Sequence, residues 1–98
     1  MKLVINFLEG FFKDSVTITL NGKDIFSGVI TTQTQVGFAY KQEVEIHNPK
    51  TEIVVEIANK NLRNKLNINI TEKTYIGYSV TGDNQLVNKI QNKPFFFL

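Results

Sequence analysis

The chain has 98 residues, of which 42% are hydrophobic and 20% are charged, and its formal net charge is +2. This length is typical of one domain, so residues 1–98 are expected to form a single domain. The small net charge is not that of a disordered acidic tail or a strongly basic arm, so we expect no nucleic-acid partner. The absence of cysteine excludes disulfide scaffolds, cysteine-ligated metal sites and thiol nucleophiles.

The N-terminus and the longest apolar runs bear on where the protein works. No apolar run approaches the roughly 20 residues that a membrane-spanning helix needs, so no membrane partner is expected. A secretory signal peptide is not predicted, because Asn6 interrupts the apolar stretch Leu3–Ile5 and Glu9 follows soon after. These features favour a cytoplasmic protein, or a component of a particle that is assembled in the cytoplasm.

The composition strongly favours β-structure. Eleven isoleucines, nine valines and nine threonines stand against two alanines, the reverse of a helical composition. Apolar and polar residues alternate along several segments, and this period of two places one strand face in a core and the other in water. In chain order, strands are expected at 2–8, 15–20, 23–31, 37–46, 52–58, 66–71, 74–80, 85–90 and 95–98.

Turn-forming residues separate these strands. Asn21-Gly22 is the strongest hairpin signal, because both positions of a tight two-residue turn need positive φ. A two-residue turn would place Ile18 opposite Ile25. Short strands with turns at this spacing predict a two-sheet antiparallel β-sandwich of eight or nine strands, of immunoglobulin-like, Greek-key or jelly-roll type. Further turns or loops are expected at 31–35, 47–50, 59–65, 81–84 and 91–94, with at most one helical turn at 61–66.

Residues suited to catalysis or metal binding are sparse. His47 is the only histidine, and it has no second histidine or cysteine at ligand spacing. Four glutamates lie on the polar faces of two expected strands: Glu43, Glu45, Glu52 and Glu56. If those strands pair, the four side chains share one face, a pattern more typical of a solvated sheet than of a catalytic carboxylate pair. We therefore expect a non-enzymatic protein without catalytic residues, metal or cofactor.

Adjacent aromatic residues occur at two places where a small sandwich has little room for them. Phe11 and Phe12 direct their rings to opposite sides of an extended backbone, and Phe96 and Leu98 share one side of the expected last strand. A two-layer sandwich buries one face of each strand, so the other face needs a loop of the same chain, a partner subunit or a larger assembly. These four residues are a candidate interaction surface. The occupant would be a protein partner or a second copy of the chain, and the module would self-associate through its apolar terminal strands.

Carbohydrate binding is the alternative hypothesis. Sugar-binding sandwiches present flat aromatic rings and amide side chains, which stack on sugar rings and hydrogen-bond to hydroxyl groups. The chain is rich in asparagine and glutamine, although it lacks tryptophan, a common stacking platform. The candidate ligand-binding residues are Gln33, Gln35, Tyr40 and Tyr78. The sequence leaves the choice between a protein-interaction or assembly module and a carbohydrate-binding module open.

Two segments resemble patterns of other β-sandwich proteins. The segment Val16–Phe26 resembles the hairpin V-x-I-x-h-[ND]-G-K-x-h-F, which occurs across many sandwich folds. The stretch from Tyr75–Tyr78 through Pro94–Phe97 resembles the ending of small uncharacterised bacterial or phage β-sandwich proteins. The resemblance implies the sandwich fold, and it carries no activity and no functional residue over to this chain.

Overall fold

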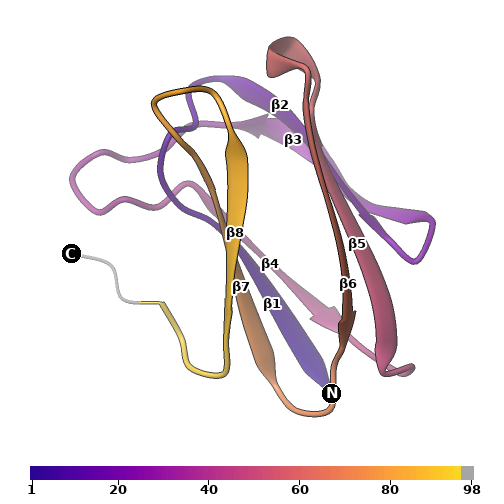
Figure 1. Ribbon diagram of the computed structural model, residues 1–98. Coiled ribbons are helices and arrows are strands. Elements are labelled where there is room, and N and C mark those ends of the chain that lie inside the picture. The colour runs from indigo at the N-terminus through magenta and orange to yellow at the C-terminus, as the bar shows by residue number, and fades with distance from the viewer. Residues whose placement is uncertain (96–98) are drawn as a thin grey trace.

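The computed structural model describes residues 1–95, in which eight strands form two packed sheets (Figure 1). Sheet A has the strand order β4-β1-β7-β8, and sheet B has the order β3-β2-β5-β6. The two-sheet β-sandwich predicted from the sequence is confirmed. The elements are β1 (Lys2–Phe7), β2 (Asp14–Leu20), β3 (Lys23–Ile30), β4 (Tyr40–Glu45), β5 (Lys50–Ile57), the 3-10 turn η1 (Ala58–Lys60), β6 (Leu62–Asn69), β7 (Thr74–Val80) and β8 (Leu86–Gln91).

One strand pair departs from the antiparallel order. β1 runs parallel to β7, with Leu3 opposite Thr74, whereas the other strand pairs in residues 1–95 are antiparallel. Parallel neighbours cannot be joined by a hairpin, and here the connection is the whole of residues 8–73. β1 and β2 lie in different sheets, so the strand grouping is not that of an immunoglobulin domain, in which the first two strands share a sheet.

The β2–β3 hairpin has the predicted turn but a different register. Asn21 and Gly22 both have positive φ, as a tight two-residue turn requires. Ile18 nevertheless pairs with Phe26 and not with Ile25. A β-bulge next to the turn makes Ile25 an extra residue on β3, which shifts every later pair by one. The predicted pairing of Ile18 with Ile25 is therefore wrong.

The polar segment 59–65 is largely a strand and not a loop. η1 and Asn61, which has φ 54, form a tight connection, and β6 begins at Leu62. β6 then pairs with β5 along its whole length, from Leu62 opposite Ile57 to Asn69 opposite Lys50. The predicted loop at 59–65 and the helical turn allowed at 61–66 are both wrong, because pairing with β5 outweighs the polar composition of β6.

The core lies between the inward faces of the two sheets. The Phe7 ring contacts Phe11 edge-to-face at 5.4 Å between centroids and stacks on Tyr78 at 5.7 Å. The Tyr78 hydroxyl is buried without a hydrogen-bond partner among residues 1–95, and burial raises the pKa of Tyr78. Further side chains at 0% exposure complete the core: Leu3, Ile5, Val16, Ile18, Ile53, Val55, Ile57, Ile70 and Ile76.

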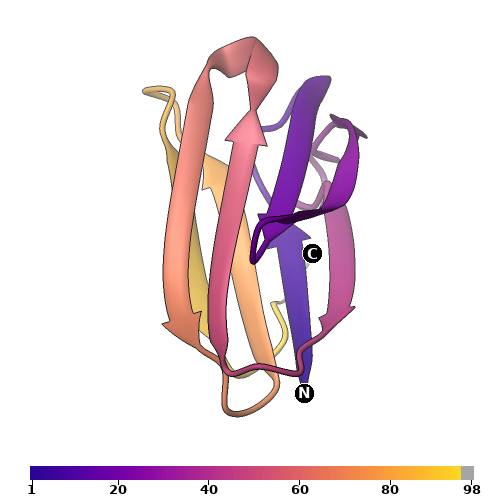
Figure 2. The same cartoon turned by 90° about the vertical axis from the view of Figure 1, so that its right-hand side faces the viewer.

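Along the two long sides of the sandwich, β3 lies beside β4 and β6 lies beside β8 (Figure 2), and different side-chain contacts close the two sides. Where β3 and β4 meet, the rings of Phe26 and Tyr40 stack at 4.3 Å between centroids. Where β6 and β8 meet, the Asn88 side-chain amide donates a hydrogen bond of 2.9 Å to Asn64 Oδ1. The first side is therefore closed by aromatic packing and the second by an amide pair.

After β8 the chain turns back over the outer face of sheet A (Figure 1). The Gln91 side-chain amide donates hydrogen bonds to the carbonyls of Lys93 and Pro94, at 2.8 and 3.2 Å. The ring of Phe95 then lies against Gly77 of β7, where an added Cβ would be 2.8 Å from Phe95 Cζ. Glycine at position 77 is what allows this close approach.

Candidate functional site

The neighbouring residues Phe11 and Phe12 occupy opposite environments. Phe11 is 3% exposed and belongs to the core, whereas Phe12 is 68% exposed. The other aromatic residues in the described part of the chain are buried or half-buried. The prediction that the two rings point to opposite sides is confirmed. The placement of Phe11 on an interaction surface is wrong, because its ring packs against Phe7 inside the sandwich.

The backbone that carries Phe12 is fixed by hydrogen bonds. The Phe12 N–H donates to Asp14 Oδ2 at 2.9 Å. Phe11 and Thr32 bond reciprocally: the Phe11 N–H donates to Thr32 Oγ1 at 3.1 Å, and the Thr32 N–H donates to the Phe11 carbonyl at 2.8 Å. The exposed ring therefore sits on an ordered backbone, so a partner that binds it loses little conformational entropy in ordering the loop.

Lys13, which follows the exposed ring, has a left-handed backbone conformation. Its φ is 47°, and the other three non-glycine residues with positive φ in residues 1–95 are asparagines, which tolerate this region better. For lysine the conformation costs about 1 kcal/mol. The Lys13 N–H donates to Thr31 Oγ1 at 2.8 Å, and its ammonium lies 5.5 Å from the centroid of the Phe12 ring. Backbone strain of this kind concentrates at functional segments.

Asp14 ties this loop to η1 through a buried ion pair. Its side chain is 0% exposed, and the Lys60 ammonium lies 2.8 Å from Oδ2 and 3.1 Å from the Gly10 carbonyl. The Asn59 side-chain amide donates to Oδ1 at 2.7 Å. Burial alone raises the pKa of Asp14, but hydrogen bonds from Lys60, the Phe12 N–H and Asn59 outweigh it, so the pKa lies below its ordinary value. The charged carboxylate therefore holds the loop that presents Phe12.

A cavity of about 440 Å³ opens beside the Phe12 ring. The Glu9 carboxylate lies against Gly37, where an added Cβ would be 3.0 Å from Oε1. Within residues 1–95, neither this carboxylate nor the Thr34 hydroxyl forms a hydrogen bond, so both are available to a ligand. The lining joins the β1–β2 and β3–β4 connections: Glu9, Gly10, Phe11, Phe12, Thr32, Thr34 and Gly37.

A second hollow, of about 490 Å³, shares Glu9 and Gly10 with the first and extends to Lys60 and the β7–β8 turn. Gly10 has φ 91°, and an added Cβ would lie 2.0 Å from the Val80 carbonyl oxygen, so only glycine fits here. The Val80 N–H donates to the Glu9 carbonyl at 2.9 Å. The segment 9–13 therefore lies between two hollows at one end of the sandwich. Binding sites are commonly built from loops at such a position.

The residues of the carbohydrate hypothesis do not form one site. Gln33 and Gln35 are exposed in the β3–β4 connection, where Gln33 makes a β-bridge with Phe38. The half-buried Tyr40 ring stacks on Phe26 and donates its hydroxyl hydrogen bond to the neighbouring Gln42. Tyr78 is 0% exposed. Placing Tyr78 at a ligand surface is wrong, because its ring is part of the core.

Phe96 and Leu98, the other half of the predicted interaction surface, lie outside the described residues. The predicted last strand at 95–98 begins within them, and Phe95 belongs to no strand. It lies against Gly77, whose register partner Asn6 is 3% exposed on the outward side of β1. Up to Phe95, the chain's own C-terminal segment therefore covers part of sheet A.

The four glutamates do not share one face. Glu43 and Glu45 lie in sheet A and Glu52 and Glu56 in sheet B, because the connection after β4 crosses between the sheets. Glu43 lies 3.1 Å from the ammonium of Lys2. Hydrogen bonds from lysines lower the pKa of Glu43, as is normal for a solvated sheet face.

Several residues of the Phe12 cavity carry no signal in the sequence that marks them as site residues. Glu9, Thr32 and Thr34 come from two loops that are separated in the chain by β2 and β3, and no local pattern brings them together. The one usable signal is Gly10 directly before the two phenylalanines, which indicates a tight bend at that point.

Comparisons with known proteins add no functional assignment. The chain matches no protein-family model, no curated protein and no solved structure. Among residues 1–95, no group of three or more His, Cys, Asp or Glu residues could hold a metal ion. The same range contains no helix that is long and apolar enough to cross a membrane. The similarity to small bacterial and phage sandwich proteins stays a prediction.

Proposed function

We propose that this chain is a non-enzymatic protein-interaction module that binds a partner protein at Phe12 and the adjoining cavity. One observation carries the proposal: a phenylalanine ring that is 68% exposed stands on a hydrogen-bonded, strained backbone. Single exposed apolar residues are common on protein surfaces. The fixed backbone on both sides of Phe12 and the cavity beside it distinguish this residue from ordinary exposure.

The surroundings of Phe12 match the composition of an interface centre. An apolar side chain of the partner packs on the Phe12 ring, while hydrogen-bond donors of the partner reach the Glu9 carboxylate and the Thr34 hydroxyl. Aromatic anchors that are surrounded by polar groups carry most of the binding energy in many interfaces. Because the loop is already ordered, little of that energy is lost in fixing it.

The proposal is tested by selecting binders from a peptide library displayed on phage, with the complete chain as bait. We expect selected peptides to carry an apolar residue and to lose at least about tenfold in affinity for the Phe12→Ser variant. If the partner is a second copy of the chain, sedimentation velocity over a range of concentrations should detect self-association. This self-association should disappear in the Phe12→Ser variant.

Val29 supplies the matched control, because it is 69% exposed on β3 and thus as accessible as Phe12. Val29→Ser should leave peptide binding and sedimentation unchanged. Equal losses in the two variants would show general surface stickiness and overturn the proposal. It also fails if no selected peptide and no self-association depends on Phe12.

A further inference from the structure

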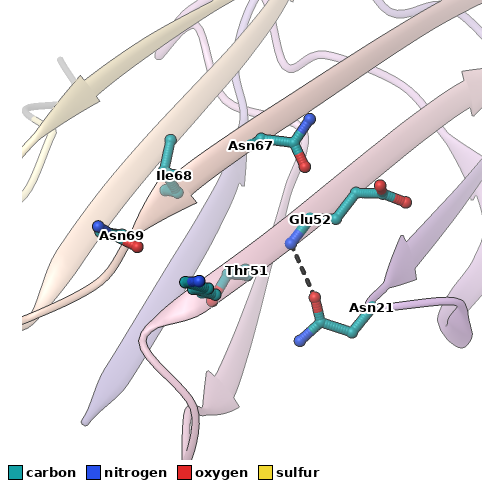
Figure 3. A pocket seen from close by; sticks show the side chains of 7 residues that line it. Asn21, Thr51, Glu52, Asn67, Ile68 and Asn69 are labelled. Atoms are coloured by element: carbon teal, nitrogen blue, oxygen red, sulfur yellow. Dashed lines mark hydrogen bonds between the residues drawn. The ribbon is translucent and has the colours of Figure 1, made fainter.

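A groove of about 440 Å³, lined mostly by polar residues, lies at the end of the sandwich opposite Phe12, because Phe12 lies just before β2 and Asn21 directly follows it. Figure 3 shows Asn67, Glu52 and Asn21 in a row across β6, β5 and the β2–β3 turn. The strand register places Glu52 opposite Asn67, so these two side chains leave the same face of sheet B. The full lining is Asn21, Lys50, Thr51, Glu52, Asn67, Ile68 and Asn69.

The groove is rigid because its two sides are joined by the backbone. The Asn21 N–H donates to the Glu52 carbonyl at 2.9 Å, and the Glu52 N–H donates to Asn21 Oδ1 at 2.8 Å. Asn21 has positive φ, which asparagine adopts readily in a tight turn. The turn is thus fixed against β5 without the strain that Lys13 carries.

Three of the six polar side chains that line the groove have no partner in the described part of the chain and can bind a ligand. Within residues 1–95, the side-chain amides of Asn67 and Asn69 form no hydrogen bond, and the Lys50 ammonium forms no ion pair. The Glu52 carboxylate is 3.4 Å from the Lys65 ammonium. Each amide offers two donors and an acceptor, so donors and acceptors stand side by side on one fixed surface.

This mixture of groups selects among ligand classes. An anion that reached Lys50 would meet the Glu52 carboxylate, and a hard cation would find a single carboxylate where it needs several oxygen ligands. An apolar ligand would find no apolar side chain beside Glu52 and Asn67, because Ile68 points to the other face of β6 and packs against the core. Neighbouring hydroxyl groups, each both a donor and an acceptor, match the Asn67 amide and the Glu52 carboxylate, which stand opposite each other in the strand register.

We propose that the groove between Asn21 and Asn69 is a carbohydrate-binding site that holds vicinal hydroxyl groups through side-chain amides. The site is independent of Phe12 and of the protein-interaction function. No aromatic ring lines the groove, so the sugar is held by hydrogen bonds without stacking, and its affinity is weak.

Weak binding calls for amide-proton NMR of the complete, nitrogen-15-labelled chain, titrated with maltose, cellobiose, lactose and diacetylchitobiose. At least one disaccharide should shift the backbone signals of residues 50–52 and 67–69 and the side-chain amide signals of Asn67 and Asn69. The Asn67→Ala variant should bind that sugar roughly fivefold more weakly, the effect of losing one or two hydrogen bonds.

Gln85→Ala is the matched control, because it removes an exposed amide in the β7–β8 turn, outside the groove. It should bind the sugar as the unaltered chain does, and so should Phe12→Ser. The proposal is overturned if none of the four sugars shifts the groove signals or if Asn67→Ala binds as tightly as Gln85→Ala. Inorganic phosphate is titrated in parallel, and equal shifts with phosphate would make the groove an anion site and reject the carbohydrate.

Discussion

The two ends of the sandwich differ in how they present their functional groups. At the Phe12 end, an apolar ring is held by irregular backbone, by a strained Lys13 and by the buried Asp14–Lys60 ion pair. At the Asn21 end, polar groups stand on regularly paired strands and on an unstrained turn. The first end depends on a few costly local features, whereas the second follows from ordinary strand pairing.

This difference predicts where the molecule is sensitive to change. A substitution at the Phe12 end leaves a buried charge unpaired or forces atoms into tightly packed backbone, and either change lowers the free energy of unfolding by several kcal/mol. A similar substitution at the Asn21 end removes only groups that water can replace. Making the same type of substitution at each end therefore compares how much each arrangement contributes to the free energy of unfolding.

The largest difference is expected for the two carboxylates. Asp14→Ala leaves the Lys60 ammonium partly buried without its partner and should lower the free energy of unfolding by about 3–5 kcal/mol. Glu52→Ala breaks an exposed pair with Lys65 and should cost less than about 1 kcal/mol. Urea unfolding of both variants measures the two values, and similar losses would contradict the contrast between the ends.

A smaller difference is expected for two glycines with positive φ. Gly10→Ala places a Cβ 2.0 Å from the Val80 carbonyl oxygen, and the combined clash and strain should cost about 3 kcal/mol. Gly22→Ala, in the hairpin turn, meets no atom within 4 Å and should cost about 1 kcal/mol through conformation alone. Thermal unfolding ranks the two variants, and the reverse order would show that the Gly10 loop adjusts freely.

The smallest effect is a dependence on pH at the Phe12 end. The pKa of Asp14 is lowered from its ordinary value of 3.8 in the folded chain. Its contribution is therefore complete above that value and is lost as the pH falls through the folded pKa, since the unfolded chain then binds the proton more tightly. Urea unfolding between pH 7 and 2.5 should show a shallower fall for Asp14→Asn than for the unaltered chain. Identical pH profiles would mean that Asp14 does not stabilise the loop through its charge.

The alternation of apolar and polar residues, together with the turn residues, was enough to predict the sandwich. Within each strand, this pattern indicates which side chains are buried. Partner choice was not predictable in the same way. The parallel pairing of β1 with β7 joins residues about 70 positions apart, and nothing local in either strand records the other. The bulge at Ile25 was not predictable either, and the residue after it, Phe26, stacks on Tyr40 of the other sheet, far away in the chain.

The site was predicted only in part. The neighbouring phenylalanines indicated that one ring is exposed. Which of the two rings points inward depends on the contact between Phe11 and Phe7 of β1. Tyrosine is at home both on surfaces and in cores, so Tyr78 could not be assigned from its type. The groove residues Asn67 and Asn69 alternate with isoleucines, a usable sign of an amide-bearing face, yet Asn21 joins them only through folding.

The place of β1 has a consequence for biosynthesis. β1 lies between β4 and β7. Its inward face is buried in the core, and its outward face is also buried at Asn6. β1 is translated before the other seven strands, but one of its two neighbours, β7, is translated only after five further strands. Until β7 is made, the apolar strand β1 stays unpaired on one edge. Such long-range pairing slows folding, and chaperones protect the exposed apolar surface of nascent chains.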